Sequence, residues 1–168
     1  GRFLEMDAEG KTPAELSSAK AFKQFDGSLT AALKSAKRKG YDGVVFRNLD
    51  DAPNLSDPSD HYAIFDPNKI KLSDPITKDD AGNVIPLSKR FQQTSDDIRY
   101  MPSDDEYLNA VKRGNTQATQ DMVDAAAKAA GYTIGPVYHG TPTGGFNVFD
   151  KRMRGETSGV SRQAFSFT

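Results

Sequence analysis

The sequence predicts a mixed α+β fold, and three observations support that prediction. Short apolar runs typical of buried strands occur in the first and last thirds of the 168-residue chain. Amphipathic stretches with helical spacing lie between these runs. Hydrophobic residues make up 36% of the sequence, which is enough for a modest core in one domain or in two small pieces.

Composition excludes several function classes. The 22 basic and 23 acidic residues leave a net charge of -1, so no overall field makes a nucleic acid the default partner. The absence of cysteine excludes a disulfide framework, a thiolate zinc site and a cysteine nucleophile. His61 and His139 are the only histidines and match no metal-binding spacing, so we predict no metal site.

Two features concern location and completeness. No apolar run is long enough to span a bilayer, and the first residues lack the layout of a signal peptide. We therefore expect a soluble protein that works in a cytoplasm, without a membrane partner. No initiator Met precedes Gly1 and the last residues read as an unfinished strand, so we expect a segment of a longer protein.

The first part of the chain predicts one helix and two buried strands. Ser28 is expected to cap a helix that has a basic last turn and ends before Gly40. Its apolar residues recur at helical spacing: Leu29, Ala32, Leu33 and Ala36. Residues 43–47 and 62–66 read as strands, separated by a polar loop over 50–59.

The middle of the chain predicts a linker and two helices. Residues 74–102 show no sustained periodicity and are expected to form an extended linker over the surface. Ser103 and Glu106 form a capping box for a short helix through about Arg113. Thr116 is expected to cap a second helix, which ends before Gly131. The predicted domains are thus 1–73, the linker 74–102, a helical pair 103–131, and 132–168.

The last part returns to strand patterns and contains the sharpest motif. Residues 136–141, 144–149 and 163–168 read as strands, and the first of them carries Tyr-His-Gly-Thr. His139 and the hydroxyl of Thr141 can hydrogen-bond a ribose or an amide, while a glycine lets a ligand approach the backbone. A single histidine near a strand end is also often structural, so the motif alone leaves both interpretations open.

Three elements of the last third, in order, resemble a known family. They are Tyr-His-Gly-Thr at 138–141, Gly-Phe-x-x-Phe at 145–149, and a strand of the Phe-x-Thr kind at 165–168, where the sequence is Phe-Ser-Phe-Thr. This pattern resembles the opening half of the ADP-ribosyltransferase domain of phage polyvalent proteins. The first 75 or so residues resemble the closing half, through 4–10, 39–46 and 60–71.

The order of the halves is therefore inverted. Such a chain either spans the end of one domain and the start of the next, or is a circular permutant. The resemblance implies a split β-sandwich, permuted or partial, with a two-helix insertion. Opening and closing strands of that fold are neighbours around an NAD cleft, so the strand bearing His139 is expected beside the strand that follows Asp60. Closure within one chain or a domain-swapped dimer would both satisfy this arrangement.

The resemblance also implies a set of site residues. The cofactor is NAD, and its ribose and nicotinamide or adenosine portions would lie against His139, Gly140 and Thr141. Ser166 and Thr168 would line the cleft. One arginine of the nearby loop, Arg162 by preference over Arg152 or Arg154, would contact the pyrophosphate, although such a run also suits a solvated loop.

A catalytic carboxylate is expected at the start of the last strand. Related transferases place a glutamate there to stabilise an oxocarbenium-like transition state. This chain offers Asp60 and His61, and Asp60 is the predicted catalytic residue, with a loop-solvating role as the alternative. The family's middle region, which supplies an aromatic residue that stacks on nicotinamide, is not present in this chain.

Three functions remain open at this point. The first is an NAD-dependent transferase of a phage protein, delivered with the virion or made in the bacterial cytoplasm, that modifies a host macromolecule. The second is a catalytically inert structural or linker segment between neighbouring domains of a phage polyprotein. The third is a nuclease with His139 as general base, which lacks an accompanying lysine or second histidine at motif spacing.

Overall fold

The computed structural model describes residues 1–18, 25, 27–54, 56–91, 105–141, 144–154 and 163–168. These residues form two compact units, and each is described by itself below. The sheet unit contains Gly1–Asp66, Val137–Pro142 and Asp150–Thr168. The helical unit contains Pro67–Pro136 and Thr143–Phe149. The predicted α+β class is confirmed, since the described residues include a four-stranded mixed sheet and four α-helices.

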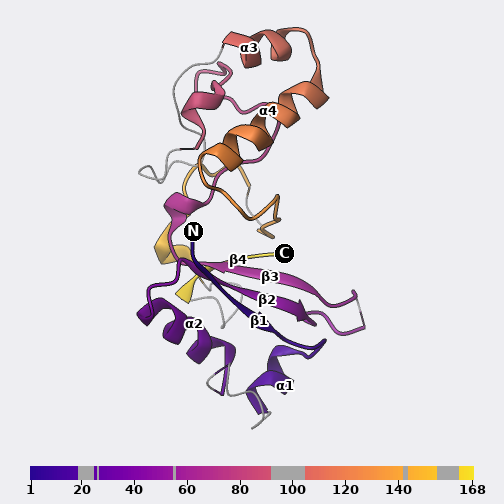
Figure 1. Cartoon of the computed structure of the whole chain (residues 1–168), viewed down its shortest axis with the longest axis vertical. Helices are drawn as coiled ribbons and strands as arrows, with labels where there is room; N and C mark the ends of the chain where they lie inside the picture. Colours follow the sequence, from indigo (N-terminus) through magenta and orange to yellow (C-terminus); the bar gives the residue numbers. More distant parts are fainter. Residues whose placement is uncertain (19–24, 26, 55, 92–104, 142–143, 155–162) are drawn as a thin grey trace. The chain divides into compact units, whose positions relative to one another are not determined.

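The sheet has the order β1-β2-β3-β4 (Figure 1). Its strands are β1 (Phe3–Asp7), β2 (Gly43–Leu49), β3 (Ser59–Ile64) and β4 (Phe165–Phe167). β1 and β2 are parallel, whereas β3 runs antiparallel to both β2 and β4. The last strand therefore joins the first 66 residues to the end of the chain. One chain supplies all four strands, so a swapped dimer is not needed to complete this sheet.

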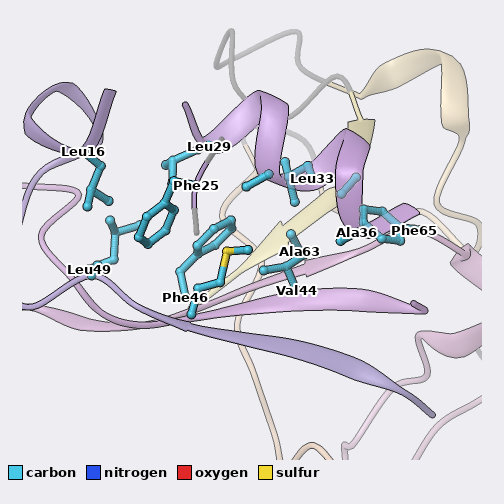
Figure 2. Close-up of a cluster of buried hydrophobic side chains, with 14 residues drawn as sticks. Leu16, Phe25, Leu29, Leu33, Ala36, Val44, Phe46, Leu49, Ala63 and Phe65 are labelled. Carbon is cyan, nitrogen blue, oxygen red and sulfur yellow. The ribbon is translucent and has the colours of Figure 1, made fainter. Parts of the chain in front are cut away.

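Two helices, α1 (Pro13–Ser18) and α2 (Leu29–Arg38), form the connection between the parallel strands β1 and β2 (Figure 1). The predicted cap of α2 is confirmed, because the Ser28 side chain accepts a hydrogen bond from the N–H of Ala31 at 3.1 Å. The apolar stripe of α2 packs on β2 and β3 in a cluster of buried side chains (Figure 2). That cluster includes Leu29, Leu33, Ala36, Val44, Phe46, Ala63 and Phe65. Helical periodicity in the sequence thus places α2 correctly on the sheet.

The predicted strand over 136–141 is present only as a single backbone pair. The N–H of Tyr138 donates to the carbonyl of Thr168 at 2.7 Å, and the N–H of Thr168 donates back at 3.0 Å. The remaining residues of that segment are irregular, and residues 144–149 carry one isolated bridge residue rather than a strand. Glycine and proline at 135, 136, 140 and 142 interrupt the alternation that a longer strand needs. A 3-10 turn, Lys151–Met153, follows before β4.

The helical unit contains α3 (Asp105–Lys112) and α4 (Thr116–Ala129), with 3-10 turns at Pro67–Lys69 and Leu87–Lys89. Both predicted helices are confirmed, while Ser103 of the predicted capping box lies outside the described residues. The cap of α4 differs by one residue, because the Asn115 side chain and not Thr116 accepts from the N–H of Ala118, at 3.1 Å. Asn115 and Thr116 are both good capping residues, and the positive φ of Gly114 ends α3 just before them.

Part of the expected surface linker over 74–102 is instead core. Leu87 and Phe91 pack with Tyr107 and Val123 in the helical unit. Arg90 is fully buried there, and its guanidinium donates to the carbonyls of Leu72 and Asp74 and contacts the Tyr107 hydroxyl. The segment is held by hydrogen bonds and by separate apolar side chains. Because it has no repeated apolar face, its sequence shows little periodicity.

Candidate functional site

The two faces of the sheet are set by strand alternation. Val44, Phe46 and Ala63 point toward α2 and belong to its core cluster. The residues between them point the other way. Register aligns Glu5 with Val45, Val45 with Tyr62, and Tyr62 with Phe167 on that second face. We call it the site face, because the two residues that matter most for the expected chemistry lie on it.

His139 lies at the β4 end of the site face. Its Nδ1 is 2.8 Å from the carbonyl oxygen of Ser166, and its ring lies against Phe167 with 5.2 Å between ring centroids. A carbonyl oxygen only accepts, so Nδ1 carries the proton in this hydrogen bond. In the neutral ring Nε2 is then the acceptor atom. The contact with Ser166 thus sets both the orientation and the tautomer of an exposed imidazole.

Asp60 is the second residue of β3 and lies on the same face. Its Oδ2 accepts from Nη1 of Arg47, and its Oδ1 accepts from the N–H of Asn48 at 3.1 Å. Partial burial acts to raise the pKa of Asp60, but the hydrogen bonds from Arg47 and Asn48 and the charge of Arg47 outweigh it. The net pKa is lowered. Asp60 is therefore an ionised carboxylate and unsuited to act as a general acid at neutral pH.

The expected neighbourhood of His139 and Asp60 needs one correction. β4 lies between β3 and the segment that carries His139, so the two are not adjacent strands. His139 is level with Phe167 and Tyr62, and Asp60 precedes Tyr62 by two residues. Strand spacing and rise then separate the two Cα atoms by about 12 Å. They share one face of one sheet without touching each other.

Sequence reasoning missed the residue that organises Asp60. Arg47 contacts Asp60 on β3 and also Glu5 on β1, with 3.2 Å between Nη2 and Oε1 of Glu5. The hydrogen bonds that Arg47 donates to Glu5 and then to Asp60 raise the pKa of Arg47, which stays charged at every working pH. The signal in the sequence was an arginine that directly follows the buried run Val-Val-Phe. Its partners are 42 and 13 residues away, so only the sheet register reveals them.

A local backbone irregularity brings Arg47 to Asp60. Phe46 pairs with His61 and Leu49 with Ser59, so β2 has one more residue than β3 between these pairs. The extra residue is accommodated at Asn48, whose φ is +55°. Such a bulge bends the strand and redirects side chains beside it. The Asn48 N–H is thereby aimed at the Asp60 carboxylate.

The other expected site residues are distributed around His139. Gly140 and Thr141 follow it on exposed backbone, and a Cβ added at Gly140 would meet no described atom within 4 Å. Packing therefore does not require that glycine. Ser166 aligns with Ala63, so its side chain belongs to the α2 face and only its carbonyl serves His139. Thr168 contributes the backbone pair with Tyr138.

The arginines of the last loop have other partners. Arg162 lies outside the described residues. Arg154 donates to the carbonyl of Gln163 at 3.1 Å, and its guanidinium lies over the Phe165 ring. Arg152 pairs with Asp150, and these hydrogen bonds lower the pKa of Asp150 to about 2. Through these contacts, Arg152 and Arg154 stabilise the loop before β4.

No group of three or more histidine or carboxylate side chains in the described ranges is placed to hold a metal ion. No described helix has the length and apolar character needed to cross a membrane. Comparison with protein-family models, with curated proteins and with solved structures finds no match.

Proposed function

We propose that this chain is an NAD-dependent ADP-ribosyltransferase-like domain of a phage polyvalent protein, which transfers ADP-ribose to a host macromolecule. The observation that carries the proposal is the continuous sheet that joins β3 of the closing half to β4 and Tyr138 of the opening half. Residues 137–141 and β4, which carry two of the three family-like elements, thereby lie in one compact unit with β3, whereas residues 145–149 belong to the helical unit. His139 and Asp60, the two residues with assigned roles, lie on one face of the sheet.

The site face offers two groups suited to this chemistry. NAD supplies a bond between ribose C1′ and the nicotinamide nitrogen, and cleavage leaves positive charge on the ribose as neutral nicotinamide departs with the bonding electrons. The ionised Asp60 stabilises positive charge, and its lowered pKa keeps it ionised. His139, with its proton held on Nδ1, presents Nε2 as an acceptor for a ribose hydroxyl.

Gly140 and Thr141 would contribute beside His139. The open space around Gly140 suits the close approach of a ligand to the backbone. The exposed Thr141 side chain carries a hydroxyl that both donates and accepts. We place NAD along this exposed segment, and the neighbouring strand side chains of the site face, Phe167 and Ile64, are buried and lie outside the proposed contact. An acceptor nucleophile of the host would then form the new bond to C1′ and lose its proton to solvent. The proposed setting is the bacterial cytoplasm, reached with the virion or by synthesis there.

One observation favours the inert alternative as the second candidate. Arg47 holds Asp60 and Glu5 together, and the guanidinium offsets part of the negative charge that a transferase needs. An ion pair of this kind also has a purely structural role across three strands. The inert structural segment therefore remains the rival function, and the two make opposite predictions for NAD.

Calorimetric titration with NAD separates the two candidates. We expect wild type to release heat at one site per chain and His139→Ala to bind about tenfold more weakly, the loss of roughly one hydrogen bond. His61→Gln is the matched control, because His61 aligns with Phe46 on the α2 face. Asp60→Asn should keep NAD binding and stop nicotinamide release. No heat with folded wild type would overturn the transferase proposal.

A further inference from the structure

Four exposed cations lie close together at the end of α2 in the sheet unit. α2 contains no acidic residue, and its exposed side includes Lys34, Lys37 and Arg38. These three have spacings of three and four residues, so their side chains share one face of the helix. Lys39 follows at the C-cap. We refer to these four residues and Arg2 as the basic end.

Arg2 reaches the basic end from a distant part of the sequence. Its Nη2 donates to the carbonyl of Lys39, 37 residues away, and its guanidinium stacks on Tyr41 with 4.3 Å to the ring centroid. Folding thus adds a fifth cation to four that the sequence already groups. The balanced net charge of the chain conceals this local excess.

One carboxylate, that of Asp42, lies beside the basic end, but no side-chain ion pair joins the basic end to a described carboxylate. Lys37 lies over the ring of Phe65 at 5.8 Å, and Asp42 accepts from the backbone N–H of Arg2 instead of its guanidinium. Favourable interaction with the helix dipole accounts for cations in a last turn. The helix dipole does not explain Lys34, which lies one turn earlier, or the contact of Arg2 with this end of the helix.

We propose that the basic end binds the phosphate backbone of a nucleic acid, without reading its sequence. Five closely grouped cations are complementary to a row of phosphates, and binding would release counterions from the nucleic acid. Arg2 covers one face of Tyr41, so that ring face is not open for stacking on a base. An anionic membrane is the less suitable partner, because membrane-surface helices also insert apolar side chains. The apolar residues of α2 are instead buried on the sheet (Figure 2).

This surface is independent of the proposed NAD site. α2 covers the face of the sheet formed by Val44, Phe46 and Ala63, whereas His139 and Asp60 lie on the opposite one. A nucleic acid on α2 and a dinucleotide on the site face would therefore not compete. Nucleic-acid binding goes beyond the proposed transfer reaction and does not depend on it.

Fluorescence anisotropy with a labelled 20-base-pair duplex tests the proposal. With about four phosphates neutralised, we expect a slope of about -3.6 in a plot of log K against log salt, and about a hundredfold loss of affinity from 50 to 200 mM NaCl. The variant Lys34→Gln/Lys37→Gln/Arg38→Gln keeps helix-forming residues and should weaken binding at 50 mM at least about tenfold, with a slope smaller by about 2.7.

The matched control removes three cations from the helical unit. Lys112→Gln/Arg113→Gln/Lys128→Gln changes net charge equally on exposed positions and should alter affinity less than about twofold. Circular dichroism of both variants checks that the helices persist, and His139→Ala and added NAD should leave the anisotropy unchanged. Equal losses in the two triple variants, no binding by folded wild type at 50 mM, or binding to anionic vesicles but not to the duplex would each overturn the proposal.

Discussion

The sheet unit and the helical unit are held together by different interactions. The cluster between α2 and the sheet consists of apolar side chains alone, with Val44, Leu16 and Phe25 fully buried. The helical unit also has an apolar cluster, which includes Leu87, Phe91 and Val123, but in addition it buries a guanidinium, that of Arg90, beside Tyr107. Apolar contacts are numerous, individually small and non-directional, whereas each hydrogen bond to Arg90 has one specific partner. The two units should therefore respond differently to substitution.

The Arg90 centre links three parts of the helical unit. Its guanidinium donates to the carbonyls of Leu72 and Asp74, while the Tyr107 hydroxyl donates to the carbonyl of Pro75 at 2.7 Å. The segment 72–75 is thereby fixed to α3. Burial lowers the pKa of Arg90, although the group remains charged, and its Nε has no hydrogen-bond partner among the described residues. These hydrogen bonds fix the position of the segment 72–75, but burial of the charged guanidinium carries a high desolvation cost.

The largest expected effect is in the sheet unit. Phe46→Ala removes a ring that is 4% exposed and stacks with Phe25 at 6.1 Å, so it leaves a cavity beneath α2. We expect a loss of about 3–5 kcal/mol in unfolding free energy for that unit. Hydrogen exchange followed by NMR measures each unit separately. Equal loss of protection in α3 and α4 would contradict the separation of the two cores.

Arg90→Leu should produce the next largest effect, confined to the helical unit. The substitution keeps an apolar stem but leaves two carbonyls and a hydroxyl without their donor. We expect a destabilisation of about 3 kcal/mol, seen as faster amide exchange in α3 and α4. The exposed Arg113→Leu is the control and should change stability by about 0.5 kcal/mol or less. An unchanged helical unit in Arg90→Leu would show that apolar packing alone holds it.

Two substitutions that each remove one N-cap hydrogen bond, one in each unit, allow the stability of the two units to be compared. Ser28→Ala removes the cap of α2, and Asn115→Ala removes the cap of α4. Each should cost about 1 kcal/mol, because each leaves one backbone N–H without its acceptor. Exchange rates in the first turn of each helix are the measurement. A loss that extends from α2 into α4, or the reverse, would show that the units unfold together.

The smallest effect concerns pH and the sheet unit. The pKa of Asp60 is below its ordinary value of 3.8, so the folded state binds its proton less tightly than the unfolded chain does. The contribution of Asp60 to the free energy of unfolding is complete above about pH 4, and it is lost as the pH falls through the lowered pKa. Solvent screening of a carboxylate that is 38% exposed limits it to about 1 kcal/mol or less. Chemical denaturation of wild type and Asp60→Asn at pH 7 and pH 2.5 should show the difference between the two proteins shrinking at low pH.

Local patterns in the sequence predicted most of the sheet unit. The stripe Leu29, Ala32 and Leu33 and the cap Ser28 located α2, and apolar runs located β2 and β3. Each of these signals lies within a few residues of the element that it defines. Burial against a sheet repeats every second or every third to fourth residue, so the pattern is visible without knowledge of the partner.

Interactions between distant residues were not predicted. Arg47 with Asp60 depends on a bulge at Asn48, and Arg90 with Leu72 depends on how an irregular segment crosses α3. Nothing in a local window distinguishes these arginines from solvated ones. The alternating pattern over 136–141 predicts a longer strand than the structure has, because the pattern carries no information about the pairing partner and only Tyr138 pairs. Candidate site residues could thus be named from the sequence, but not their electrostatic state.

The pairing of β3 with β4 has a consequence for the order of folding. Ile64 pairs with Phe165, a separation of 101 residues (165 minus 64), so this contact closes a long loop. Bringing such distant segments together costs chain entropy that short-range contacts do not pay. A helical unit that folds first shortens the unstructured part of that loop and reduces the cost. We therefore expect β4 to dock late, and β3 to remain an unprotected sheet edge open to aggregation until it does.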